Sequence, residues 1–194
     1  MKCMKSICFV LFLSLSISCD KTDSEFKLQS SNPVERGRNC LTEKDCFYLS
    51  ADTNLGYYSL SYSQGEYEGK LALDSLHDTD MQYGSILYGF KSTRDSSYVI
   101  VWKIEHEHFP SFIVYYLKDG RITKLGDWGF FTPCETCDVQ DYPVKDIRIA
   151  QRNDKIEFLF QKDVAFVDYG ESLYNKDWGL FKAGELKLSF NILK

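Results

Sequence analysis

Histidines and cysteines are the residues of this 194-residue chain whose types could hold a metal ion or supply a reactive thiol. His106 and His108 stand two positions apart, at the end of an apolar run that begins at Tyr98. Side chains at positions i and i+2 of a strand share one face, so this pair could bind a metal together. A zinc site needs a third or fourth ligand, and His77 is the one other histidine in the sequence. A solvated strand end is the alternative interpretation, and we expect no metal or other cofactor.

The segment Cys134-Glu135-Thr136-Cys137 is a CxxC motif, which occurs in redox and zinc sites. A thioredoxin-like site would place the motif at the start of a helix, but here it lies between Pro133 and Pro143 without a helical pattern. A four-cysteine zinc site would need a second CxxC, whereas Cys40 and Cys46 are six positions apart. We therefore interpret these cysteines as structural.

Motifs that carry other enzymatic chemistry do not occur. The sequence has no Gly-x-Ser-x-Gly, no phosphate-binding glycine loop and no His-Glu-x-x-His. The acidic segment 74–80 resembles a calcium loop loosely but lacks the glycine and terminal glutamate of an EF-hand. We predict that the chain is not an enzyme.

The N-terminus has the layout of an export signal. Lys2 and Lys5 precede an apolar run of about a dozen residues, shorter than the roughly 20 that a transmembrane helix needs. The small residue Ser18 and then Cys19 follow, and this end resembles the lipobox of bacterial lipoproteins, although Leu15 stands one position earlier than the usual leucine.

The resemblance implies that residues 1–18 are a signal peptide and that Cys19 becomes the lipidated first residue. The polar residues after Cys19 predict a flexible tether over 19–38, followed by a single β-rich domain over 39–194. The chain would then sit in the cell envelope, anchored to the inner or outer membrane with its domain in the periplasm or at the cell surface.

The cysteine count supports an oxidising location. Removal of the signal and lipidation of Cys19 leave Cys40, Cys46, Cys134 and Cys137, an even number in an exported protein, which predicts disulfides. Four cysteines allow three connectivities, and the neighbouring pairs are the simplest.

Net charge limits the classes of partner. The formal charge is −5, and loss of Lys2 and Lys5 with the signal brings it near −7. Phosphates of nucleic acids and anionic lipids repel such a chain, so we expect no nucleic acid partner and membrane contact through the lipid only. A basic protein partner fits this charge better.

Alternating β-formers and turn residues after Cys46 predict an all-β or mainly β domain of antiparallel sheets, either a sandwich or a partial propeller. The turns are expected at Asp119-Gly120, Asn153-Asp154 and Ala183-Gly184, and Leu71–His77 could be a short helix instead of a strand. Asp127-Trp128-Gly129 recurs as Asp177-Trp178-Gly179, which suggests related sheets or blades. The predicted strands are Phe47–Ser50, Tyr57–Tyr62, Glu68–Leu73, Ser85–Lys91, Tyr98–Glu105, Phe112–Lys118, Arg121–Leu125, Asp146–Gln151, Lys155–Gln161, Val164–Val167 and Glu185–Phe190.

The hypothesis that follows is a non-catalytic protein-binding module on a lipid anchor, in concrete form a periplasmic immunity or inhibitor protein against a secreted toxin. The alternatives are an envelope-assembly or structural lipoprotein and a small metal-dependent hydrolase. Loops on a rigid sheet present binding residues well, and the candidates are Gln64–Glu68, His77–Tyr83 and Glu135–Asp141.

Overall fold

The computed structural model describes residues 23–34, 37–52, 57–65, 71–77, 84–105, 110–130, 144–167 and 178–192. Within these ranges the chain forms fourteen strands, one 3-10 turn and no α-helix, so the predicted all-β class is confirmed. The elements are β1 (Ser24–Pro33), β2 (Gly37–Cys40), β3 (Asp45–Asp52), β4 (Tyr57–Gln64), β5 (Leu71–His77), β6 (Ser85–Ser92), β7 (Tyr98–Glu105), β8 (Pro110–Lys118), β9 (Arg121–Phe130), η2 (Val144–Asp146), β10 (Ile147–Arg152), β11 (Lys155–Phe160), β12 (Val164–Val167), β13 (Trp178–Phe181) and β14 (Lys187–Asn191).

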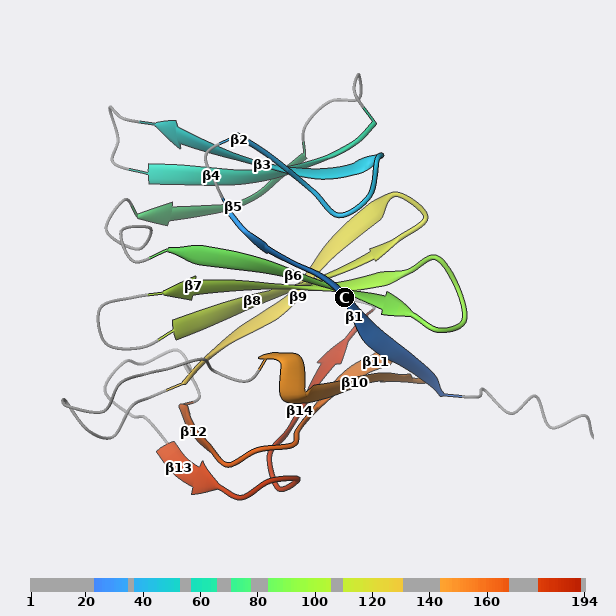
Figure 1. Ribbon diagram of the computed structural model, residues 1–194, viewed down its shortest axis with the longest axis vertical. Helices are drawn as coiled ribbons and strands as arrows, with labels where there is room; N and C mark the ends of the chain where they lie inside the picture. The colour runs from blue at the N-terminus through green and yellow to red at the C-terminus, as the bar shows by residue number, and fades with distance from the viewer. Residues whose placement is uncertain are drawn as a thin grey trace, which may run out of the picture.

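Ten of these strands form one antiparallel sheet in the order β13-β12-β9-β8-β7-β6-β1-β10-β11-β14. The sheet curls until β14 approaches β9, so that eight of its strands make a nearly closed barrel (Figure 1). Side chains fill this last seam: the Phe190 ring of β14 stacks on Trp128 of β9 with ring centroids 5.9 Å apart. Phe190 also covers Gly126, where an added Cβ would lie 2.6 Å from the ring atom Cε1.

The remaining four strands form a small antiparallel sheet in the order β2-β3-β4-β5. This sheet lies over the outer side of β6, β7 and β8, as the upper layer in Figure 1. Phe47 and Leu49 of β3 and Leu60 of β4 pack there against Ile100 and Trp102 of β7. A barrel-like sheet with a second sheet layered on it is therefore the form that the predicted antiparallel architecture takes.

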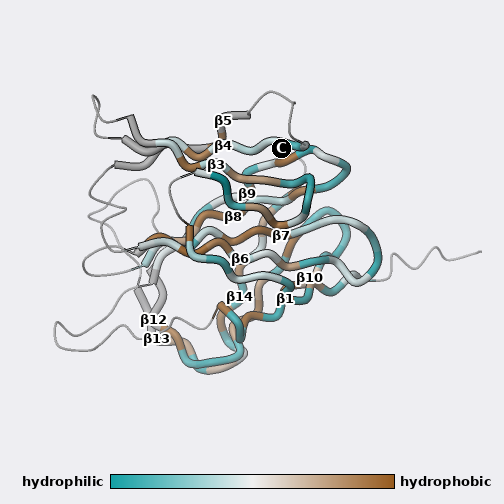
Figure 2. The backbone as a smooth tube through the Cα atoms, turned by 45° about the horizontal axis from the view of Figure 1, so that its top comes forward, coloured by the Kyte–Doolittle hydropathy of each residue, from teal (hydrophilic) through white to brown (hydrophobic). Residues whose placement is uncertain are grey.

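Strand β7 shows why its sequence is an almost unbroken apolar run. Val99 and Val101 point into the barrel, while Ile100 and Trp102 point toward the small sheet. Successive side chains of a strand face opposite sides, so a strand between two cores needs apolar residues at nearly every position. Figure 2 shows β7 and β8 as largely hydrophobic segments on the side of the barrel that faces the small sheet.

Residues 24–33 correct the predicted tether. They form β1, which pairs with β6 on one side and β10 on the other, and Phe26 is buried in the barrel core. The segment looks polar because most of its side chains are exposed. Only Ser24 and Phe26, near its start, are buried. The folded domain therefore begins before residue 39, and residues 1–22 lie outside the described part of the chain.

The local turn signals predict the hairpins correctly. Asp119 and Gly120 join β8 to β9 with φ values of 50° and 73°, as a primed two-residue turn requires. Asn153 takes a φ of 55° between β10 and β11, and Gly184 takes 84° in the turn before β14. The segment Leu71–His77 is strand β5 rather than a helix, because it completes the small sheet beside β4.

The two Trp-Gly segments lie in one sheet instead of marking separate blades. β9 and β13 flank β12, and Val167 of β12 pairs with Gly129 on one side and with Trp178 on the other. Trp128 is a core residue of the barrel, 2% exposed, and stacks on Phe112 at 5.4 Å between ring centroids. The repeat therefore reflects two similar strands on either side of a third.

Candidate functional surface

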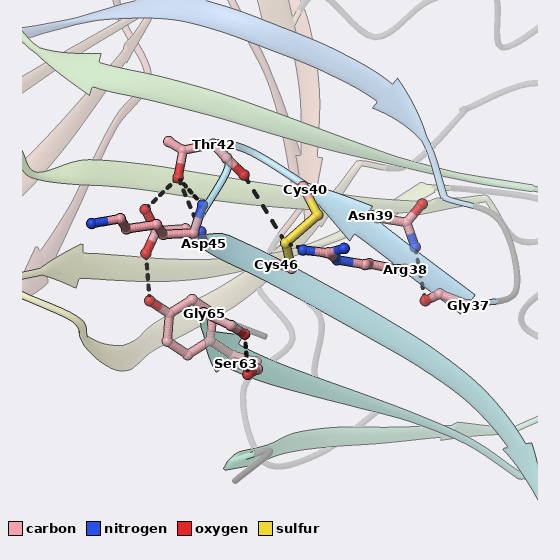
Figure 3. The surroundings of a disulfide bond; sticks show 11 residues. Gly37, Arg38, Asn39, Cys40, Thr42, Asp45, Cys46, Ser63 and Gly65 are labelled. Carbon is pink, nitrogen blue, oxygen red and sulfur yellow. Dashed lines mark hydrogen bonds between the residues drawn. A yellow bond between two sulfur atoms is a disulfide. The ribbon is translucent and has the colours of Figure 1, made fainter. Parts of the chain in front are cut away.

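A disulfide closes the hairpin between β2 and β3. Cys40 and Cys46 are cross-strand partners with Cα atoms 4.0 Å apart, and their sulfur atoms are bonded (Figure 3). Of the three connectivities that the sequence leaves open, these two cysteines have the neighbouring one. Because β2 is a four-residue edge strand, the covalent bond holds a short strand that few backbone hydrogen bonds could hold alone.

Hydrogen bonds make the turn of this hairpin rigid. The Thr42 hydroxyl donates to the Asp45 carboxylate at 2.7 Å and accepts from the Asp45 backbone N–H at 2.9 Å. The Tyr62 hydroxyl donates to the same carboxylate at 2.7 Å from the neighbouring strand β4. Figure 3 shows these contacts beside the disulfide. The turn presents Glu43 and Lys44, both exposed, on a backbone fixed from two sides.

Among the side chains that the structure describes, the outer side of the small sheet carries serine hydroxyl groups, the Tyr48 ring and the Arg38 guanidinium. Arg38 pairs with Tyr48 and Tyr48 with Ser61, while Ser50, two residues after Tyr48, pairs with Ser59. These five positions alternate with the buried residues of β3 and β4, so they form one solvent-facing surface, which we call the serine face. The Ser50 and Ser59 hydroxyls share a hydrogen bond of 2.8 Å.

The serine face carries residue types that are also found at recognition surfaces. Tyrosine and serine dominate antibody contact loops, and tyrosine and arginine are common among residues that dominate binding energy at interfaces. Arg38 is held in place, since its Nε donates to Sγ of Cys46 at 3.3 Å. A sheet stapled at its edge loses little conformational freedom when a partner binds.

The sequence-predicted candidates fall mostly outside the described residues. This holds for Cys19, Cys134, Cys137, His106 and His108, and β7 is described up to Glu105. Of the three candidate loops, the described residues are Gln64 at the end of β4, Gly65 after it, and His77 at the end of β5. Gln64 lies over Gly120 of the β8–β9 hairpin. Within the described ranges, no three His, Cys, Asp or Glu side chains gather in a way that could hold a metal ion.

Two polar groups are buried inside the barrel, and no sequence pattern predicted their burial. Lys103 is 3% exposed and lies on the same face of β7 as Val99 and Val101. Nε1 of Trp128 is buried without a hydrogen-bond acceptor, among the rings of Phe158 and Phe160. An N–H group enclosed by rings can point at an aromatic face, which is a weak interaction.

One carboxylate at the rim of the barrel is strongly perturbed. Asp95, in the β6–β7 hairpin, accepts hydrogen bonds from the Ser97 hydroxyl at 2.5 Å and the Ser97 N–H at 3.0 Å, and Nζ of Lys118 lies 3.2 Å away. Burial raises the pKa of Asp95, but the hydrogen bonds from Ser97, with those of Ser92 and Lys118, together bring it well below its usual range. The group ties the hairpin to the end of β8.

Comparison with protein-family models, curated proteins and solved structures found no match, so a functional assignment rests on this chain's own residues. In the part of the chain that the structure describes, there is no helix of the length and apolar character needed to cross a bilayer.

Proposed function

We propose that this chain is a lipid-anchored protein of the bacterial cell envelope whose β-domain is a non-catalytic protein-binding module. In its specific form, the module is a periplasmic immunity or inhibitor protein that occupies a secreted toxin. The envelope location is supported by the lipobox-like sequence that ends at Cys19 and by the Cys40–Cys46 disulfide, a bond that persists in oxidising compartments.

The serine face is the observation that carries the binding role. Its tyrosine, serines and arginine are exposed or half-buried on a sheet that is fixed by a disulfide and by the hydrogen bonds of Asp45. The formal charge of −5 favours a basic partner, because opposite net charge accelerates encounter.

Lipidation is tested by metabolic labelling with palmitate followed by mass spectrometry of the N-terminal peptide. The wild-type chain should carry acyl chains on Cys19, and Cys19→Ala should remain an unlabelled, unprocessed precursor. An N-terminal peptide that retains its first methionine without any acyl group would contradict the anchor.

Binding is tested with a photo-crosslinking amino acid at Ser59, expressed in the native envelope. We expect a cross-link to a secreted protein that kills cells lacking this gene, and the cross-link should disappear in the Arg38→Ala/Tyr48→Ala variant. Lys162→Ala, on another surface, is the matched control and should leave it intact. A cross-link to an assembly protein or outer-membrane barrel would replace the immunity role by the structural one.

A further inference from the structure

A basic face lies on the barrel although the whole chain is acidic. Phe26, Ile149 and Phe158 point into the barrel, so the residues that alternate with them on β1, β10 and β11 point outward. The same alternation applies on β6 and β14. The outward positions carry six cations, which define the basic face: Lys27, Lys91, Arg148, Arg152, Lys155 and Lys187.

Strand register brings these cations together from distant parts of the sequence. Lys27 is the cross-strand partner of Lys91, and Lys155 is the partner of Arg152. Leu159 pairs with both Arg148 and Lys187, so these two cations lie on either side of β11. The six cations therefore lie on neighbouring strands of one sheet, and their side chains form one surface.

The acidic groups on this face are fewer than the cations. Glu25 pairs with Arg148, and Glu157 lies between Arg152 at 3.3 Å and Lys187 at 2.7 Å. Asp23 also contacts Arg152 at 3.3 Å. The cations Lys27 and Lys155 make no ion pair within the described part of the chain, and Lys91 lies over the Tyr98 ring. The face therefore has a positive surplus open to solvent.

The chain enters the fold on this same face. Asp23 precedes β1 and contacts Arg152, and Cys19 is four residues earlier in the sequence. Four residues span at most about 14 Å when fully extended. An acyl group on Cys19 would therefore hold the barrel against the headgroups, with no long spacer between them.

We infer that the basic face docks on the anionic phospholipid headgroups of the membrane to which the chain is anchored, in place of the contact through the lipid alone that the net charge predicts. The inference rests on the proposed lipidation of Cys19 for its geometry. Lys27 and Lys155 supply unpaired positive charge, and a basic segment near an anionic bilayer gains attraction with each lysine or arginine. The small sheet covers the barrel at β6 to β8, away from β10, β11 and β14, so docking leaves the serine face toward solvent (Figure 1).

The first experiment removes the anchor and measures charge alone. The mature chain with Cys19→Ser is mixed with vesicles of phosphatidylcholine, with or without about one-third phosphatidylglycerol. We expect binding to the anionic vesicles that weakens as salt rises, and a loss of about 25-fold or more in Lys27→Glu/Lys155→Glu, since each lysine contributes about fivefold. Lys44→Glu/Lys162→Glu changes the net charge by the same amount at two positions outside the basic face and should bind within about twofold of the parent. Equal losses in the two variants, or no binding, would overturn the proposal.

The second experiment uses the full chain, purified from membranes and reconstituted in the same two vesicle types. Amine labelling should be slower at Lys27 and Lys155 in anionic vesicles than in neutral ones, with Lys44 unchanged. Equal labelling overturns the docking, as does a cross-link from Lys27 to an acidic protein in cells. The Cys19→Ser variant in the first experiment has no acyl group and can bind vesicles only through its charge. If the wild-type chain proves not to be acylated, the proposed anchor is wrong, but the first experiment still tests the basic face.

Discussion

A substitution at Phe26 tests whether the N-terminal segment 24–33 is a strand of the barrel or a flexible tether. Its side chain is 5% exposed, lies in the barrel core and meets the Tyr116 ring edge-on at 6.5 Å between centroids. Phe26→Ala removes a buried ring and leaves a cavity, which costs about 3–5 kcal/mol in protein cores. For a domain of this size each kcal/mol lowers Tm by about 2–4 °C, so we expect Tm to fall by roughly 6–20 °C.

Urea unfolding of the mature chain with Cys19→Ser, followed by tryptophan fluorescence, measures the change in free energy. Lys27→Ala is the matched control, because Lys27 is the next residue of β1 and points to solvent. Its effect should stay within about 0.5 kcal/mol. If Phe26→Ala unfolds with the same midpoint and slope as Lys27→Ala, then β1 is not part of the sheet and the barrel described above is wrong.

Three further predictions concern the disulfide-closed hairpin between β2 and β3, the contact between β9 and β14, and Asp95 at the rim of the barrel. Replacing both Cys40 and Cys46 by serine opens a loop with a sequence separation of 6 and should lower the free energy of unfolding by about 2 kcal/mol; an unchanged urea midpoint would show that the hydrogen bonds alone hold the hairpin. Gly126→Ala should cost about 1–3 kcal/mol, because its Cβ would lie 2.6 Å from Phe190, and Phe190→Leu should cost less in that background than alone if the clash is real. Because folding lowers the pKa of Asp95, its carboxylate contributes stability that is complete above about pH 4 and is lost as pH falls below that value. Asp95→Asn should therefore flatten the acid side of a stability-against-pH profile, and an unaltered profile would count against the hydrogen bonds from Ser97 as its source.

The all-β class and the hairpins could be read from the chain because their causes are local. Asp119-Gly120 accepts the positive φ values of a tight turn wherever it occurs, and alternating apolar residues favour strands before any partner is known. The contact between Cys40 and Cys46 also has a local cause, since a short hairpin brings them opposite each other.

The sequence could not predict β1, because that strand is defined by its neighbours. Its polar outward positions resemble a tether, and only pairing with β6 and β10 makes Phe26 a core residue. The candidate surfaces were hidden for the same reason: the serine face joins strands β2, β3 and β4, and no short motif marks it.

By itself, then, the order of amino acids determined an antiparallel β class and its tight turns, and it predicts an export signal at the N-terminus and disulfides whose pairing it leaves open. Only the tertiary structure decided that Lys27, Lys91, Arg148, Lys155 and Lys187 share a surface. Net charge is a sum over residues and carries no positions, whereas strand register assigns each side chain a side of the sheet and a neighbour. A chain with a formal charge of −5 can therefore present a basic face.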